Sequence, residues 1–252
     1  MVSTRELISF CSTTLDAERF RDAAVNGLQV EGKQTVHRLA TSVSVSERTI
    51  RAAIGWNADM FLVHHGLLWG ERTGPIMGPL RTRLRLMLEA EMNLVAYHLP
   101  LDAHATIGNN ARLIQELGLR VERPFAEISG QPIGFIASSE PMIALEDLAH
   151  RIERLTSRAP TVLPGGSGKI ERIAVVSGSG YSTLEEVAAL DCQALVTGDV
   201  REPTMALARE LGVTVLAGGH EATERLGVQA LADLLKQRFQ IETRFFSDPN
   251  PI

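Results

Sequence analysis

The chain has 252 residues, a formal net charge of −5, 44% hydrophobic residues and 22% charged residues. These values are ordinary for a globular protein that buries a sizeable core. The negative charge argues against a general affinity for nucleic acid or anionic membranes. No apolar run approaches the roughly 20 residues that span a bilayer, and no signal peptide is recognisable. Because Cys11 and Cys192 are isolated in the sequence, we expect a cytoplasmic protein without disulfides.

Apolar runs alternate with helical patterns in the first half of the chain. The sequence predicts a strand at 39–45, a helix at 46–54 and a strand at 59–63. A further helix–strand unit ends at His98, and a closing helix follows at 109–117. Strands that alternate with helices are typical of βαβ units with right-handed crossovers. The first half is therefore expected to form an α/β lobe.

The second half repeats this order. It predicts a strand at 172–177, a helix at 183–190 and a strand at 192–197, then a helix–strand unit ending at His220 and a helix at 223–239. A shift of 133 positions aligns the first three elements with those of the first half. The predicted fold class is α/β, with two similar lobes that arise from an internal repeat. We expect these lobes at residues 1–125 and 126–252, with a metal site in the cleft between them.

Imidazole and carboxylate side chains follow three of the predicted strands, at the point where each strand ends. Functional sites in α/β sheets usually lie at the carboxyl ends of parallel strands. Imidazoles and carboxylates are also the ligands that borderline divalent metals take. The side chains are His64 and His65 after the first of these strands, His98 and Asp102 after the second, and His220 and Glu224 after the third.

Each of these positions also has a purely structural alternative. Residues four apart on a helix lie about 5–6 Å from one another, which suits joint coordination by His220 and Glu224. Glu224 alone is equally typical of a carboxylate at a helix start. Neighbouring residues of a strand point to opposite faces, so His64 and His65 share a site only if the chain turns or each serves a different ion. The structural alternative is one core histidine and one surface histidine. Asp102 also suits a turn.

Five candidate ligands exceed the four of a closed zinc shell. The predicted ligands are His64, His65, Asp102, His220 and Glu224. They are about right for two ions that share a bridging carboxylate and bind a hydroxide between them, an arrangement typical of hydrolases. We assign His98 to proton transfer, with a direct metal ligand or a hydrogen-bond partner of a ligand as the alternatives. The loop that contains Gly178 and Gly180 precedes a predicted helix, so its amides are candidates for substrate phosphate binding, with a plain tight turn as the alternative.

Several segments together resemble the GTP cyclohydrolase I type 2 homologue family, the NIF-three-like dinuclear-metal proteins. They are, in chain order, 26–30, 63–66, 97–102, 108–110 and 219–225. The resemblance covers essentially the whole chain and points to the short bacterial form. It implies that Glu224 bridges two ions, with His64 and His220 on one and His65 and Asp102 on the other. It also implies a toroidal homohexamer, a trimer of dimers with the metal sites facing an internal cavity.

The resemblance indicates a metal-dependent hydrolase that acts on a nucleotide or a related small molecule. Its specific form would be a GTP cyclohydrolase, in which hydroxide attacks C8 of the purine. Two alternatives remain open at this point: a two-metal phosphoesterase, and a non-enzymatic metal-binding or regulatory ring protein. The ligand types suit zinc, iron, manganese, nickel or cobalt.

Overall fold

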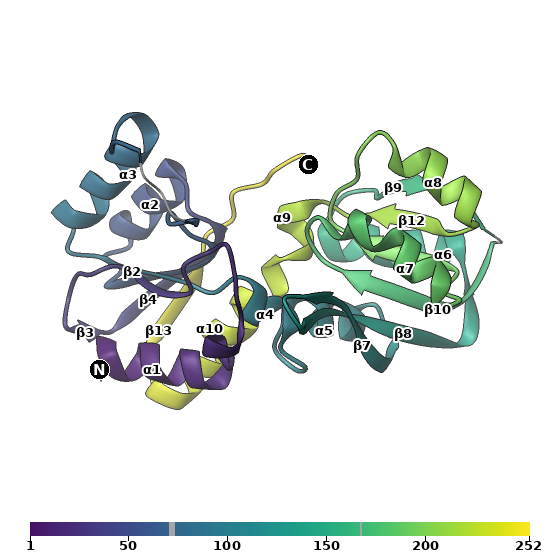
Figure 1. Ribbon diagram of the computed structural model, residues 1–252. Helices are drawn as coiled ribbons and strands as arrows, with labels where there is room; N and C mark the ends of the chain where they lie inside the picture. The colour runs from purple at the N-terminus through teal and green to yellow at the C-terminus, as the bar shows by residue number, and fades with distance from the viewer. Residues whose placement is uncertain (71–73, 167) are drawn as a thin grey trace. The chain divides into compact units, whose positions relative to one another are not determined.

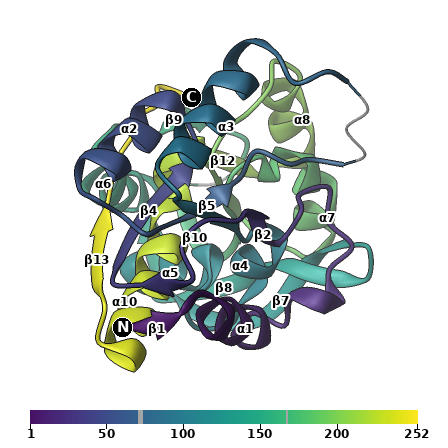
Figure 2. The same cartoon turned by 90° about the vertical axis from the view of Figure 1, so that its left-hand side faces the viewer.

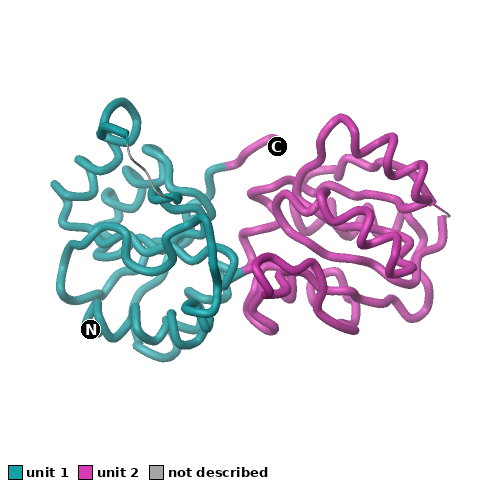
Figure 3. Tube along the Cα trace, viewed as in Figure 1, with its two compact units in different colours: residues 1–101, 227–248 teal, residues 102–226, 249–252 magenta. Residues whose placement is uncertain are grey.

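The structure is a computed structural model that describes residues 1–70, 74–166 and 168–252. The chain forms two compact units, coloured separately in Figure 3. The first comprises residues 1–101 and 227–248, and the second comprises residues 102–226 and 249–252. This division differs from the expected halves 1–125 and 126–252, because the last helix and strand of the chain belong to the first unit. Asp102, expected in the first lobe, lies in the second unit.

A five-stranded sheet forms the centre of the first unit, in the order β13-β4-β5-β6-β2. Strands β4, β5 and β6 run parallel, β13 is parallel to β4, and β2 is antiparallel to β6. The bounds are β2 Gly27–Val30, β4 Arg38–Ser44, β5 Met60–His65, β6 Asn93–Ala96 and β13 Glu242–Phe245. A separate two-stranded sheet pairs β1 (Val2–Ser3) with β3 (Thr35–Val36).

Helices cover both faces of this first sheet (Figures 1 and 2). Helices α2 and α3 lie on one face, where Ile50 and Met87 pack against Phe61 and Leu94. Helices α1 and α10 lie on the other face. Burial on both faces explains why β5 reads as a continuous apolar run. The bounds are α1 Thr4–Thr14, η1 Ala17–Arg19, α2 Glu47–Gly55, α3 Gly78–Glu89, α4 Leu99–Ala103 and α10 Arg225–Phe239.

The second unit contains a six-stranded mixed sheet in the order β7-β8-β10-β11-β12-β9 (Figure 1). Strands β10, β11 and β12 are parallel, whereas β8 is antiparallel to β7 and β10, and β9 is antiparallel to β12. The bounds are β7 Arg120–Ile128, β8 Gln131–Ala144, β9 Thr161–Leu163, β10 Lys169–Val176, β11 Ala194–Thr197 and β12 Thr214–Ala217.

Helices also cover this second sheet. Leu113 of α5 and Ile152 of α6 pack with Val175 and Val196 in one buried cluster. Side chains alternate along a strand, so the buried Leu195 of β11 lies on the opposite face of the sheet from Val196. Helix α7 contacts β11, and α8 contacts β12. The bounds are α5 Asn109–Glu116, α6 Leu145–Thr156, η2 Gly180–Thr183, α7 Leu184–Ala189, α8 Thr204–Leu211 and α9 His220–Thr223. Among the described residues, no helix is long and apolar enough to cross a membrane.

The strand pairs expected from the repeat have matching registers. Thr41 lies opposite Leu62 in the first sheet, and Ala174 lies opposite Leu195 in the second, each 133 positions after its counterpart. The flanking strands differ, because β4 is flanked by the parallel β13 and β10 by the antiparallel β8. Superposition of the two complete units stays a prediction.

Candidate metal centre

Three histidines gather in the first unit, and we call them the imidazole cluster: His64, His65 and His98. His64 and His65 are the last residues of β5, and His98 lies between β6 and α4. One ring nitrogen of each lies within 4.8 Å of those of the other two. The ring centroids of His64 and His65 are 4.6 Å apart, and that of His98 is 5.0 Å from His64. The end of the strand therefore brings adjacent histidines to one place.

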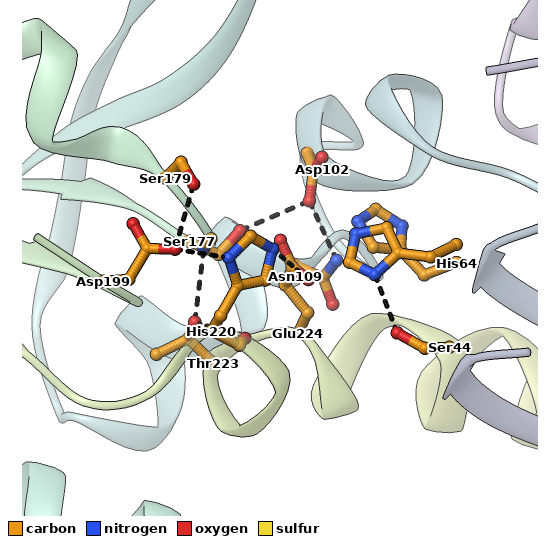
Figure 4. A network of polar contacts seen from close by, with 12 residues as sticks. Ser44, His64, Asp102, Asn109, Ser177, Ser179, Asp199, His220, Thr223 and Glu224 are labelled. Carbon is orange, nitrogen blue, oxygen red and sulfur yellow. Dashed lines mark hydrogen bonds and ion pairs between the residues drawn. The ribbon is translucent and has the colours of Figure 1, made fainter. Parts of the chain in front are cut away.

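Hydrogen bonds orient the two strand-end rings. Nδ1 of the buried His64 lies 2.9 Å from the carbonyl oxygen of Tyr97. A carbonyl can only accept, so this Nδ1 carries the hydrogen and Nε2 carries the lone pair that can coordinate a metal. Nδ1 of His65 lies 2.9 Å from the Ser44 hydroxyl, the dashed line at Ser44 in Figure 4. Metal-ligating histidines are typically oriented by such a second hydrogen bond.

The third ring of the cluster, His98, contacts a carboxylate. Its Nδ1 lies 2.9 Å from Oδ1 of Asp22, whose side chain is 2% exposed. Burial raises the pKa of Asp22, but the hydrogen bonds from His98, Ala24 and Asn26 outweigh it and lower the pKa to about 2. Asp22 is therefore ionised at neutral pH. Asp22 was not predicted from the sequence, because it follows no predicted strand and belongs to no recognised motif.

Asp102, His220 and Glu224 gather in the second unit, and we call them the carboxylate cluster (Figure 4). Both carboxylates are buried, and an oxygen of each lies within 4.8 Å of the other. Nε2 of His220 lies 3.3 Å from Oε2 of Glu224. The two residues are not on one regular helix as predicted, because α9 ends at Thr223 and α10 begins at Arg225. Their spacing of four residues nevertheless brings them into contact.

Polar side chains hold the carboxylate cluster in place. Asn109 donates to Oδ1 of Asp102 at 2.9 Å, and the Ser177 hydroxyl donates to the same oxygen at 3.3 Å. Oδ2 of Asp199 lies 2.7 Å from Nδ1 of His220 and accepts from the Ser179 hydroxyl at 3.0 Å. Asp199 was not predicted, although its place just after β11 is the kind of signal that identified the other residues.

The electrostatic environment of His220 favours its charged form. Burial lowers its pKa, but hydrogen bonding and charge from Glu224 and Asp199 outweigh this and raise the pKa to about 9. The metal-free protein therefore carries a protonated His220 at neutral pH. A metal ion that binds Nε2 must displace that proton.

The loop after β10 passes directly against Glu224. Gly178 has a φ of 61°, and a Cβ at this position would collide with Oε1 of Glu224. The Gly178 amide donates to the Thr223 hydroxyl at 3.3 Å, and the Gly180 amide donates to the Thr197 hydroxyl at 2.9 Å. These contacts give both glycines a packing role. The substrate role predicted for them stays a prediction.

The donor chemistry of the two clusters fits divalent metal ions. His64 and His220 each have Nδ1 hydrogen-bonded to a carbonyl or carboxylate oxygen, which leaves Nε2 as the coordinating atom. Buried carboxylates beside imidazole suit zinc and the neighbouring first-row metals. Each unit thus holds part of the predicted ligand set: His64 and His65 in the first, and Asp102, His220 and Glu224 in the second.

The sequence matches a known family along almost its whole length. The family described as Duf34/NIF3 (NGG1p interacting factor 3) matches residues 2–251. The chain belongs to the Duf34/NIF3 family. This confirms the family predicted from the motifs.

Curated members of the Duf34/NIF3 family are similar over their full length. A "GTP cyclohydrolase 1 type 2 homolog" from Allochromatium vinosum is 42% identical over 252 residues, covering 100% of this chain and 98% of that one. A protein of the same name from Pseudomonas aeruginosa is 38% identical over 250 residues, covering 99% of each chain.

Solved structures agree with this assignment. The protein ybgI, described as of unknown function, has a TM-score of 0.94 at 35% identity, and TTHA1606 from Thermus thermophilus has 0.90 at 36% identity. Both comparisons cover 100% of each chain. Reduced HcgD from Methanocaldococcus jannaschii has a TM-score of 0.84 at 22% identity over 97% of each chain, which supports the fold alone.

Proposed function

We propose that this Duf34/NIF3 protein binds two divalent metal ions through residues of the imidazole and carboxylate clusters. The observation that carries the proposal is the shared hydrogen-bonding of the imidazoles, in which Nδ1 is held by protein oxygens. Histidines that are oriented in this way are typical of metal ligands. The ligands would be His64, His65, Asp102, His220 and Glu224.

The proposed arrangement of the ions is the one that the resemblance to the GTP cyclohydrolase I type 2 homologue family implies. Glu224 would bridge them, with His64 and His220 on one ion and His65 and Asp102 on the other. Two divalent ions supply Lewis acidity, which lowers the pKa of water and polarises the group under attack. Asn109 and Ser177 support this assignment, because they already orient Asp102.

The activity we propose is hydrolysis of a nucleotide or a related small molecule. The family relatives named "GTP cyclohydrolase 1 type 2 homolog" make GTP the first candidate. Opening the imidazole ring of GTP needs water to lose a proton and a ring nitrogen to gain one. His98, held by Asp22 beside His64 and His65, would move that proton.

We also propose that the chain assembles as a toroidal homohexamer with the metal sites facing an internal cavity. The support is the family resemblance over the whole chain. Light scattering coupled to size exclusion tests it directly. A mass of six chains is expected, and a stable monomer or dimer at micromolar concentration would contradict it.

The proposed activity is tested by a substrate screen with reconstituted protein. Metal-depleted protein is loaded separately with zinc, manganese, iron, cobalt or nickel, and the metal content is measured in each sample. Each sample is then assayed with GTP, other nucleotides, cyclic nucleotides and simple phosphoesters. Loss of purine absorbance reports ring opening, whereas phosphate release reports a phosphoesterase.

Two variants control the screen. Glu224→Ala should abolish turnover, whereas Glu146→Ala, at an exposed position on α6, should match the wild type. Phosphoester turnover without ring opening would replace the cyclohydrolase with a two-metal phosphoesterase. No turnover of any substrate with both ions bound would contradict the hydrolase and favour the non-enzymatic metal-binding ring protein.

A further inference from the structure

The carboxylate of Asp22 is surrounded by hydrogen-bond donors. Oδ1 accepts from the Ala24 amide at 3.0 Å and lies 2.9 Å from Nδ1 of His98. Oδ2 accepts from the Asn26 side chain at 3.1 Å and from the Leu99 amide at 2.9 Å. The side chain is 2% exposed, so these protein groups take the place of water. Asp22 therefore has four partners, two at each oxygen.

This pattern fixes the proton on His98. Ala24, Asn26 and Leu99 can only donate to Asp22, so both oxygens must act as acceptors. An ionised carboxylate is acceptor-only and satisfies all of its neighbours when Nδ1 of His98 also donates. Nδ1 of neutral His98 then carries the hydrogen, and Nε2 carries the lone pair.

The segment predicted as a family motif at 26–30 anchors the same ring. Oδ1 of Asn26 accepts from the His98 amide at 2.8 Å, so Asn26 contacts both members of the Asp22–His98 pair. Oε1 of Gln29 accepts from the amides of Leu67 and Leu68 at 2.7 and 3.1 Å. Gln29 thereby ties this segment to the loop after β5, next to His65. The motif holds the polypeptide around the imidazole cluster.

The His98 ring is also enclosed by aromatic neighbours. Its centroid lies 5.0 Å from that of Trp69 at an interplanar angle of 71°, and 5.6 Å from that of His65. The side chain remains 21% exposed. His98 is thus held at a fixed orientation and stays accessible to a small molecule.

We infer that Asp22 is a positioning residue that holds His98 in the Nδ1–H tautomer, so that Nε2 accepts and returns the proton in hydrolysis. The inference rests on the proposed function for the identity of the reaction. Nε2 takes a proton from the attacking water, and the resulting imidazolium is stabilised by the Asp22 carboxylate. The same proton passes to the leaving atom, so His98 ends the cycle neutral.

The tautomer is measured without any substrate. Nitrogen NMR of ¹⁵N-histidine-labelled protein, metal-depleted and zinc-loaded, distinguishes a protonated ring nitrogen from one with a lone pair. The His98 signals are identified as those lost in His98→Gln. The wild type should show Nδ1–H and a bare Nε2. An Nε2–H tautomer in the metal-depleted wild type would overturn the inference, whether or not any variant folds.

Variants then test the role of Asp22. Asp22→Asn offers one acceptor oxygen to four donors, so His98 should lose the single tautomer. Asp16→Asn is the control, since Asp16 is exposed and lies in the same region of the chain. Asp22→Asn should keep both ions and lower kcat by about 10²–10⁴-fold with KM nearly unchanged, because aspartate-to-asparagine changes beside a catalytic histidine act through the tautomer. An unchanged His98 tautomer in folded Asp22→Asn would overturn the inference.

His98→Gln separates proton transfer from metal binding. Glutamine can still donate to Asp22, so this variant should fold and retain two ions while turnover falls. Asp22→Asn should have little further effect on kcat in the His98→Gln background. Loss of one ion in His98→Gln would make His98 a ligand and overturn its assignment as the proton carrier. If the wild type hydrolyses nothing, the proposed function fails, and the tautomer measurement still decides whether Asp22 holds His98.

Discussion

Asp199 and His220 form a close carboxylate–imidazole pair, with Oδ2 of Asp199 2.7 Å from Nδ1 of His220. On the far side of the ring, Nε2 lies 3.3 Å from Glu224. His220 is therefore held between two carboxylates, of which only Glu224 is a proposed ligand. The Asp22–His98 pair in the first unit has the same chemistry at 2.9 Å. In both pairs the aspartate holds Nδ1 of the ring. Nε2 is then the nitrogen that would bind metal in His220 and transfer the proton in His98.

We predict that Asp199→Asn weakens the binding of one ion. Without the negative charge of Asp199 beside Nδ1, His220 becomes a poorer and less well-oriented ligand. Such changes cost roughly 10–100-fold in metal affinity. Competition against a chromogenic chelator measures this loss. Asp191→Asn is the matched control, because Asp191 is exposed and asparagine tolerates its φ of 54°. Equal affinities for Asp199→Asn and wild type would rule out the orienting role.

Metal uptake should release a proton from His220. The pKa of His220 is raised to about 9 in the metal-free protein, so the ring is charged at pH 7 and must lose its proton to coordinate. The ion pairs of His220 stabilise the metal-free fold fully below pH 6.5, and this stability is lost as the pH rises through about 9. Because the metal displaces this proton, and fewer His220 rings carry it at higher pH, the apparent metal affinity should increase between pH 7 and about 9.

Calorimetry in buffers of different ionisation enthalpy counts the released protons. About one proton attributable to His220 is expected at pH 7, falling towards zero above pH 9. His220→Ala should release fewer protons at pH 7 than the wild type. Identical proton counts in the two proteins would show that His220 is not the group displaced.

The bridging role of Glu224 predicts an asymmetry between ligand variants. Glu224→Ala should lower the occupancy of both ions, whereas Asp102→Ala should mainly lower the occupancy of one. Elemental analysis after reconstitution gives the number of ions per chain, with about two expected in the wild type. A wild type that holds a single ion, or loss of only one ion in Glu224→Ala, would contradict the shared-ligand arrangement.

Gly178→Ala should disturb the site through Glu224. A methyl group here adds left-handed backbone strain of about 1–2 kcal/mol and collides with the Glu224 carboxylate. Gly212→Ala is the matched control, because Gly212 has a similar φ of 70° and no atom near the added Cβ. Both should lower the free energy of unfolding in denaturant titrations, but only Gly178→Ala should weaken metal binding. Equal metal affinities in these two variants would contradict the close packing of Gly178 on Glu224.

The sequence by itself determined the family, the α/β class and the three central parallel strands of each sheet, which are β4, β5 and β6 in the first and β10, β11 and β12 in the second. A strand buried on both faces must be hydrophobic at nearly every position. Strands β5 and β12 could therefore be recognised from the local sequence as continuous apolar runs. The register of β4 with β5 and of β10 with β11 also agrees with the 133-residue shift. His64, His65 and His220 were found because polar residues that follow such runs interrupt an otherwise apolar pattern.

The tertiary structure decided which distant residues meet. β13 pairs with β4 from the other end of the chain, so the terminal helix and strand join the first unit and move the boundary away from residue 125. Asp22 lies 76 positions from His98, and its partners are two backbone amides, the Asn26 side chain and that imidazole. A loop aspartate has no periodicity to mark it. Its role depends on long-range contacts, and these exist only once the chain is folded.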